Sequence, residues 1–190
     1  MRHTQINWSS TLLAVALIVC FGACASTASA QTGTEIGIGI GHLSTRDFDV
    51  KGDGWDSTTV DFRFATPLSP HDPHWSVEVL MTVGRRHERD RRITEGTYGV
   101  LLKRSRSAVG GFSPFVTCGV LGTYRETVAP TWSDSQGAPL LLPAFGAGAR
   151  QQINSRVAIQ GDVQGIFLLV YPYGVRATAG LAIRIGGERP

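Results

Sequence analysis

The chain has 190 residues, a formal net charge of +3, and 17% charged against 42% hydrophobic residues. So mild a charge does not favour a nucleic-acid partner, and the hydrophobic content is that of a folded domain. Of the three cysteines, Cys20 and Cys24 lie in the N-terminal segment considered next. Cys118 is alone in the rest of the chain, so we expect no internal disulfide.

The first thirty residues are typical of a secretory signal peptide. A basic start precedes an apolar run over residues 12–23, and residues 28–30 are the small residues that signal peptidase requires. The run is shorter than the roughly 20 apolar residues of a membrane helix. We expect a signal peptide over residues 1–30 and one mature domain over residues 31–190. Cleavage removes one arginine and no acid, so 17 basic residues against 15 acids give a mature charge of +2.

The mature chain is rich in glycine and alternates apolar residues with polar or small ones, without a helical period. Such alternation over short segments predicts β-strands with one apolar face. Eight segments show it, and in chain order they are residues 35–41, 59–64, 76–84, 97–103, 114–124, 144–152, 157–165 and 175–185. We therefore expect an all-β fold of eight antiparallel strands.

The residue types on the two faces of these strands indicate whether the apolar face meets a protein core or lipid. In residues 157–165 the apolar row consists of Val157, Ile159 and Val163. The polar row on the opposite face consists of Gln160, Asp162 and Gln164. Across the strands the polar rows hold more Gly and Ala than a water-facing sheet usually does, and the apolar rows carry almost no charge. A lipid-facing Arg or Lys at mid-bilayer costs about 2–4 kcal/mol, so lipid contact requires an uncharged row. The pattern predicts an up-and-down transmembrane barrel with its polar rows inside.

The lengths of the connections indicate an orientation. The long polar connections over residues 44–56 and 126–139 fall at one end, and the short turn over residues 153–156 falls at the other. Outer-membrane barrels have longer loops outside and shorter turns on the periplasmic side. We therefore expect both ends of the mature chain on the periplasmic side.

A barrel of eight strands has an interior just wide enough to be filled by side chains, and buried charges there must be paired. The expected interior network consists of Asp61, Arg63, Glu78, Lys103, Arg150, Asp162, Arg176 and Arg184. We expect Asp162 to pair with one or more of Arg150, Arg176 and Arg184, because the segments that carry them are sequential neighbours.

Residues 85–92 contain five arginines and two acids, and the strand count places them in an outer loop. Arginine can grip a phosphate through two parallel hydrogen bonds, so Arg85, Arg86 and Arg92 are candidates for contact with lipopolysaccharide. The alternative is a solvated hairpin tip with internal ion pairs.

The segments PFVTCGVLGTYRE, PAFGAGARQQINSRVAIQGDVQG and GVRATAGLAIRIG resemble the OmpX/OmpW-like, small outer-membrane β-barrel superfamily. The likeness covers the whole mature chain, except that such chains usually end in an aromatic residue and this one ends in Pro190. The resemblance implies residence in a Gram-negative outer membrane. It also implies outer-membrane lipid, lipopolysaccharide and the insertion machinery as partners.

We expect a non-enzymatic protein with a structural or surface-interaction role, because no catalytic motif is diagnostic. His42 and Ser44 lie beside a polar loop and are expected to be solvated surface, and we expect no metal site and no cofactor. A narrow pore is conceivable, but side chains should fill it. The alternative is a soluble periplasmic lipocalin-like β-barrel that binds a small apolar ligand.

Overall fold

The structure is a computed structural model. It describes residues 33–46, 54–69, 72, 74–88, 90–106, 109–168 and 171–185. The expected signal peptide, residues 1–30, lies outside the described residues, as does the C-terminal residue Pro190. Within the described ranges there is no helix that is long and apolar enough to cross a membrane.

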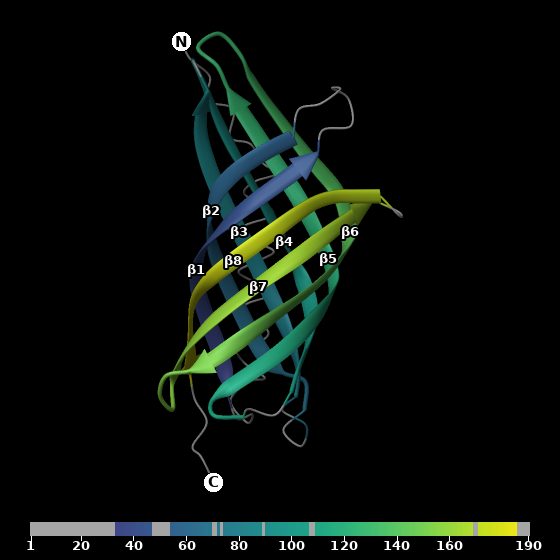
Figure 1. Cartoon of the computed structure of the whole chain (residues 1–190). Helices are drawn as coiled ribbons and strands as arrows, with labels where there is room; N and C mark the ends of the chain where they lie inside the picture. The colour runs from purple at the N-terminus through teal and green to yellow at the C-terminus, as the bar shows by residue number, and fades with distance from the viewer. Residues whose placement is uncertain are drawn as a thin grey trace.

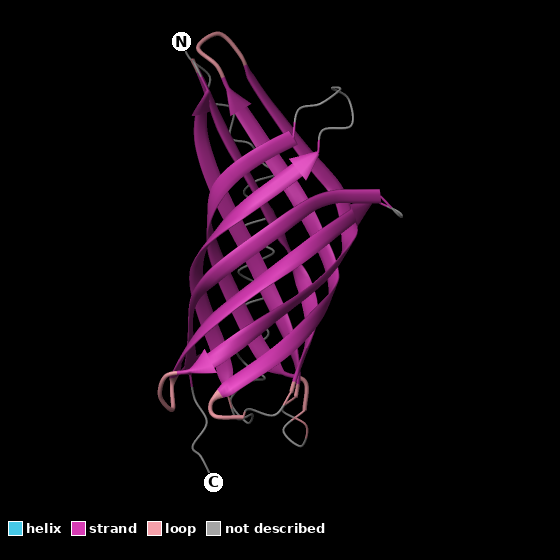
Figure 2. Ribbon diagram, in the orientation of Figure 1, coloured by secondary structure: helices cyan, strands magenta, loops and turns pink. Residues whose placement is uncertain are grey.

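Eight strands form one closed barrel in which each strand pairs antiparallel with its neighbours in sequence, and the first pairs with the last (Figures 1 and 2). The strands are β1 (Thr34–Arg46), β2 (Gly54–Pro67), β3 (Trp75–Glu88), β4 (Arg91–Ser105), β5 (Phe112–Val128), β6 (Ser133–Gln152), β7 (Val157–Leu168) and β8 (Tyr171–Ile185). The predicted fold class is confirmed. We call the end where β1 begins and β8 ends the near end, and the opposite end the far end.

The strands are strongly tilted, and their register gives the size of the offset. Starting from Glu35 and following paired residues once around the barrel leads back to β1 at Thr45, ten residues further along. This stagger sets the diameter of the barrel and the tilt of its strands. Consequently, residues at one depth in the barrel are not the residues that pair across neighbouring strands.

The outer surface is apolar, as the sequence predicts. Ile36, Ile38 and Ile40 of β1 are 46%, 52% and 69% exposed, and Ile159 and Val163 of β7 are about as exposed as these. The acids of the same strands, Glu35 in β1 and Asp162 in β7, lie at alternate positions and point into the barrel. The barrel therefore presents hydrocarbon to its surroundings and keeps polar groups within.

Several strands are longer than the sequence predicts. The loop expected over residues 126–139 is mostly strand, because β5 continues to Val128 and β6 begins at Ser133. The arginine-rich loop expected over residues 85–92 is likewise mostly strand, divided between β3 and β4. A membrane strand needs only about 9–11 residues, so β5 and β6, with 17 and 20 residues, extend beyond a bilayer. Their hairpin stands highest at the far end in Figure 1.

Two tyrosine–glycine pairs join β4 to β5 on the outer face. Tyr98 pairs with Gly122 and Tyr124 pairs with Gly96, so that each ring covers the glycine opposite. The two ring centroids are 6.5 Å apart, and the Tyr124 hydroxyl donates to the Thr82 carbonyl at 3.2 Å. Glycine is needed at position 96 because a Cβ there would overlap the Thr82 carbonyl oxygen and lie 2.7 Å from the Tyr124 ring.

Gly96→Ala should lower the free energy of unfolding by about 1–3 kcal/mol, since the added methyl overpacks the joint. Denaturant unfolding of the refolded barrel in detergent micelles measures the loss. Gly161→Ala is the matched control, because a Cβ at position 161 meets no atom closer than 3.5 Å. Equal stability of the two variants would show that the joint contributes nothing.

Candidate functional site

The inner face of the barrel carries the charged residues named from the sequence. All eight point inward, and the structure buries Asp61, Arg63, Glu78, Lys103, Asp162 and Arg176 almost completely. Arg150 and Arg184, at the near end of the barrel, are partly exposed. Strand alternation produces this arrangement, because inward positions recur every second residue in each strand.

Arg63 of β2 is the centre of the network. Its guanidinium binds both oxygens of Asp162 in β7, at 2.7 and 3.1 Å. It also donates to Asp61 on its own strand and lies 3.5 Å from Glu78 of β3. One buried cation therefore serves three buried carboxylates, on β2, β3 and β7.

Arg176 of β8 is a second, fully buried cation. It binds Asp61, donates to the Gln164 side-chain oxygen at 2.7 Å, and lies 4.0 Å from Asp162. The Gln164 amide in turn donates to Asp162 at 2.7 Å. Each carboxylate at this depth thus has at least two partners, which is how buried charge is tolerated.

Lys103 of β4 extends the network towards the near end. Its ammonium donates to the Gln160 side-chain oxygen at 2.8 Å and lies 3.6 Å from Glu78. It also lies 4.1 Å from the centre of the Phe115 ring, a cation–π distance. Lys103 is therefore held by an acid, an amide and an aromatic ring.

Glu35 organises the near end and was not predicted. Its carboxylate accepts from Arg150 at 2.6 Å and from Arg184 at 3.4 Å. The sequence did contain a signal for this role. Glu35 lies two residues before Gly37 in β1, so strand alternation places both on the inner face. Of the three arginines expected near Asp162, only Arg176 approaches it, because Arg150 and Arg184 lie at the near end.

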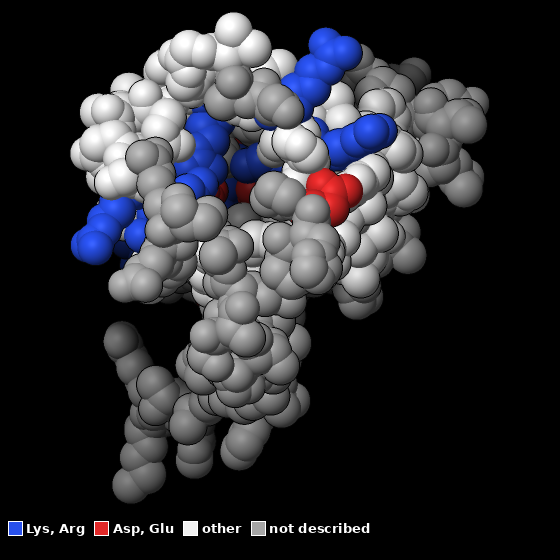
Figure 3. Space-filling model, turned by 90° about the horizontal axis from the view of Figure 1, so that it is seen from below, with Lys and Arg blue, Asp and Glu red and all other residues white. Residues whose placement is uncertain are grey.

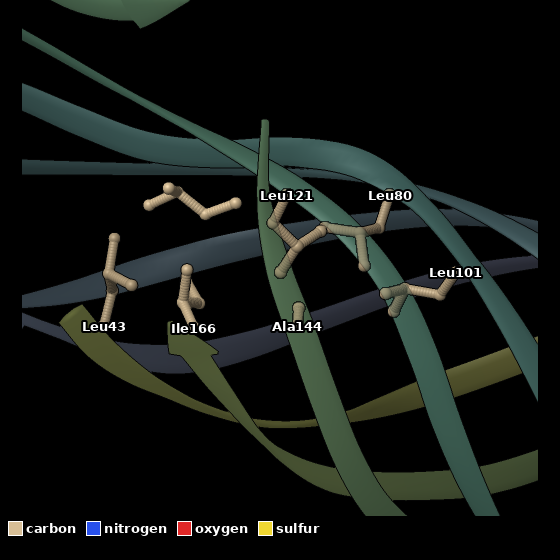
Figure 4. Packing of buried hydrophobic residues seen from close by; sticks show 7 residues of the cluster. Leu43, Leu80, Leu101, Leu121, Ala144 and Ile166 are labelled. Carbon is tan, nitrogen blue, oxygen red and sulfur yellow. The ribbon is translucent and has the colours of Figure 1, made fainter. Parts of the chain in front are cut away.

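An apolar cluster fills the part of the lumen that the charges leave (Figure 4). Its side chains come from six strands and are Leu43, Leu80, Leu101, Leu121, Leu142, Ala144 and Ile166. The cavity between Glu35, Arg63 and Gln160 measures about 20 Å³, room for about one water molecule. That cavity cannot hold a ligand larger than water.

At the far end the three arginines proposed for lipopolysaccharide divide between two faces. Arg85 and Arg92 are exposed on the outward face, where Arg85 pairs with Thr94 and Arg92 with His87. They are therefore diagonal neighbours on adjacent strands, with backbones about 7–8 Å apart. Arg86 points inward and donates to the Asp56 carbonyl at 3.5 Å. An outer ligand would meet Arg85 and Arg92 without Arg86.

His42 is also on the outward face of the barrel. Its imidazole Nε2 lies 3.4 Å from a carboxylate oxygen of Asp56, and both side chains are more than half exposed. Ser44 shares this face and pairs with Asp56 in the strand register. An exposed pair of this kind contributes about 0–1 kcal/mol to stability.

No protein-family model and no curated protein matches the chain. Solved structures do resemble it. The attachment invasion locus protein Ail of Yersinia pestis is 14% identical, with a TM-score of 0.59 over 82% of this chain and 99% of Ail. Neisserial surface protein A is 6% identical, with a TM-score of 0.58 over 80% and 96% of the two chains. The N-terminal β-barrel domain of Pseudomonas aeruginosa OprF is 15% identical, with a TM-score of 0.54 over 82% and 98%. At these identities the likeness is one of fold.

Asp162→Ala should lower the free energy of unfolding by about 3–5 kcal/mol, because Arg63, Arg176 and Lys103 then share only Asp61 and Glu78 and one buried positive charge is left uncompensated. Thermal or urea unfolding of the refolded barrel measures the change. Asp56→Ala, which removes an exposed acid, is the control and should change stability by less than about 1 kcal/mol. Similar effects of the two substitutions would contradict the assigned network.

Proposed function

We propose that this chain is an integral protein of the Gram-negative outer membrane, with a structural or surface-interaction role and no enzymatic activity. The observation that carries the proposal is the inverted barrel, with exposed isoleucine and valine outside and a neutralised charge network inside. Only a barrel surrounded by hydrocarbon benefits from this arrangement. The similar solved structures support it through their shared fold.

The filled lumen supports a role at the surface of the membrane and argues against transport. The apolar cluster and the buried network of Arg63, Arg176 and their acids both lie in the interior, and the cavity beside Arg63 has room for about one water molecule. The same filling disfavours the alternative, a soluble lipocalin-like barrel, which needs a lumen that holds a ligand. Interaction with partners is therefore assigned to the outer faces and the rims.

Lipopolysaccharide is the proposed partner at the far end. Arg85 and Arg92 are exposed and lie on one face of the barrel. They stand at the far-end edge of the band of exposed apolar side chains on the outer surface, which we call the apolar belt. Paired guanidinium groups suit phosphates because each can donate two parallel hydrogen bonds. Among the similar structures, Ail is in complex with the heparin analogue sucrose octasulfate, which supports recognition of an anionic sugar by a barrel of this fold.

Membrane residence predicts that the exported protein sediments with membranes and needs detergent for extraction, because its apolar belt is insoluble in water. Its mobility in detergent gels should differ before and after boiling. Recovery of the protein from the periplasm as a detergent-free monomer would refute this proposal.

The partner proposal predicts that replacing Arg85 and Arg92 together by Gln weakens lipopolysaccharide binding about thirtyfold, given roughly 1 kcal/mol for each cation near an anionic membrane surface. The remaining binding should respond less to salt, since screened charge contacts have been removed. Binding of the purified barrel to immobilised lipopolysaccharide across a salt series measures both effects. Arg156→Gln, in the exposed turn between β6 and β7, is the control and should bind lipopolysaccharide like the parent protein. Identical salt curves for the parent and the double variant would show that Arg85 and Arg92 do not contact lipopolysaccharide.

A further inference from the structure

A groove on the outer face at the near end has no role in the proposed function. It measures about 560 Å³ and lies where the start of β3, the end of β4 and the start of β5 meet. Its lining includes Trp75, Arg104, Arg106, Pro114 and Val116. Figure 3, a view of this end, shows Lys and Arg side chains gathered around the barrel mouth.

The backbone around the groove is held by hydrogen bonds outside the regular strand ladder. The Ser105 amide donates to the His74 carbonyl at 2.8 Å, and the Arg106 amide donates to the Pro114 carbonyl at 2.9 Å. The Ser113 hydroxyl donates to the Arg106 carbonyl at 2.6 Å. These hydrogen bonds fix the backbone that carries Arg104 and Arg106 at the rim of the barrel.

The groove combines cations with an aromatic ring. The Arg104 guanidinium lies 5.2 Å from the centre of the Trp75 ring, and both arginines are exposed. Within the described ranges neither arginine forms an ion pair with an acid. The groove also contains Asp72, whose carboxylate accepts from the His74 amide at 3.1 Å. Two arginines against one acid leave the groove with a positive charge.

Deeper in the apolar belt, the same outer face is hydrocarbon. Val116 pairs with Arg104, and two residues further from the rim Leu102 pairs with Val77 and with Cys118. Val116 is 57% exposed. A molecule in the groove would therefore have its head beside two guanidinium groups and its tail beside aliphatic side chains.

We propose that this groove binds an anionic phospholipid of the periplasmic leaflet. Arg104 and Arg106 hold the phosphate by bidentate hydrogen bonds, Trp75 lies at headgroup depth, and the acyl chain follows Val116 and Leu102. The inference rests on the proposed membrane residence. It adds a lipid site at the end opposite the proposed lipopolysaccharide contact.

Quenching of Trp75 fluorescence by brominated lipid tests the site. Replacing Trp55 and Trp132 by Phe leaves Trp75 as the reporter in the exported protein. The protein is reconstituted in vesicles of phosphatidylcholine and phosphatidylglycerol, with bromine on the acyl chains of one lipid or the other. We expect brominated phosphatidylglycerol to quench several-fold more strongly, mole for mole, and Arg104→Gln with Arg106→Gln to abolish this preference. Arg156→Gln should retain it.

The outcomes separate this inference from the proposal on which it rests. Equal quenching by the two brominated lipids in the parent protein overturns the site and leaves membrane residence intact. Absence of quenching by both overturns membrane residence as well. Inorganic phosphate added in excess should not reduce the preference, and a preference that disappears would identify a site for free phosphate in place of a lipid.

Discussion

Charge neutrality inside a narrow closed barrel is the constraint on which the rest of this structure depends. The lumen has room only for side chains, so each charge directed inward must find its counter-charge there. Arg63 meets this requirement by contacting Asp61, Glu78 and Asp162, which lie on three different strands. With its charges neutralised within, the barrel can present an outer surface of hydrocarbon.

The alternation of residue types is a local property of the chain, and it was enough to predict the strands and the faces of the barrel. The partners within the network could not be predicted in the same way. Arg63 and Asp162 lie on β2 and β7, which are not neighbours in the barrel, and they meet because the strands are staggered by ten residues around the ring. Stagger arises from closure of the whole sheet, so no single strand encodes it.

Strand length was underestimated for a related reason. A strand that crosses lipid must alternate, but one that continues into water has no such requirement. Residues 126–139 therefore read as a polar loop, although most of them pair in the β5–β6 hairpin. Glu35 was overlooked because it stands alone at the start of a strand, and its importance depends on Arg150 and Arg184 from distant parts of the chain.

The contact between Arg63 and Asp162 bears on the order of events during assembly. The two residues are 99 positions apart and lie on β2 and β7, so their contact needs strands from both halves of the chain. Before β7 joins the sheet, Arg63 has as acidic partners only Asp61 on its own strand and Glu78 on β3. The contact with Asp162 therefore forms only when the barrel closes, and because it joins distant parts of the chain, complete folding depends on the last strands.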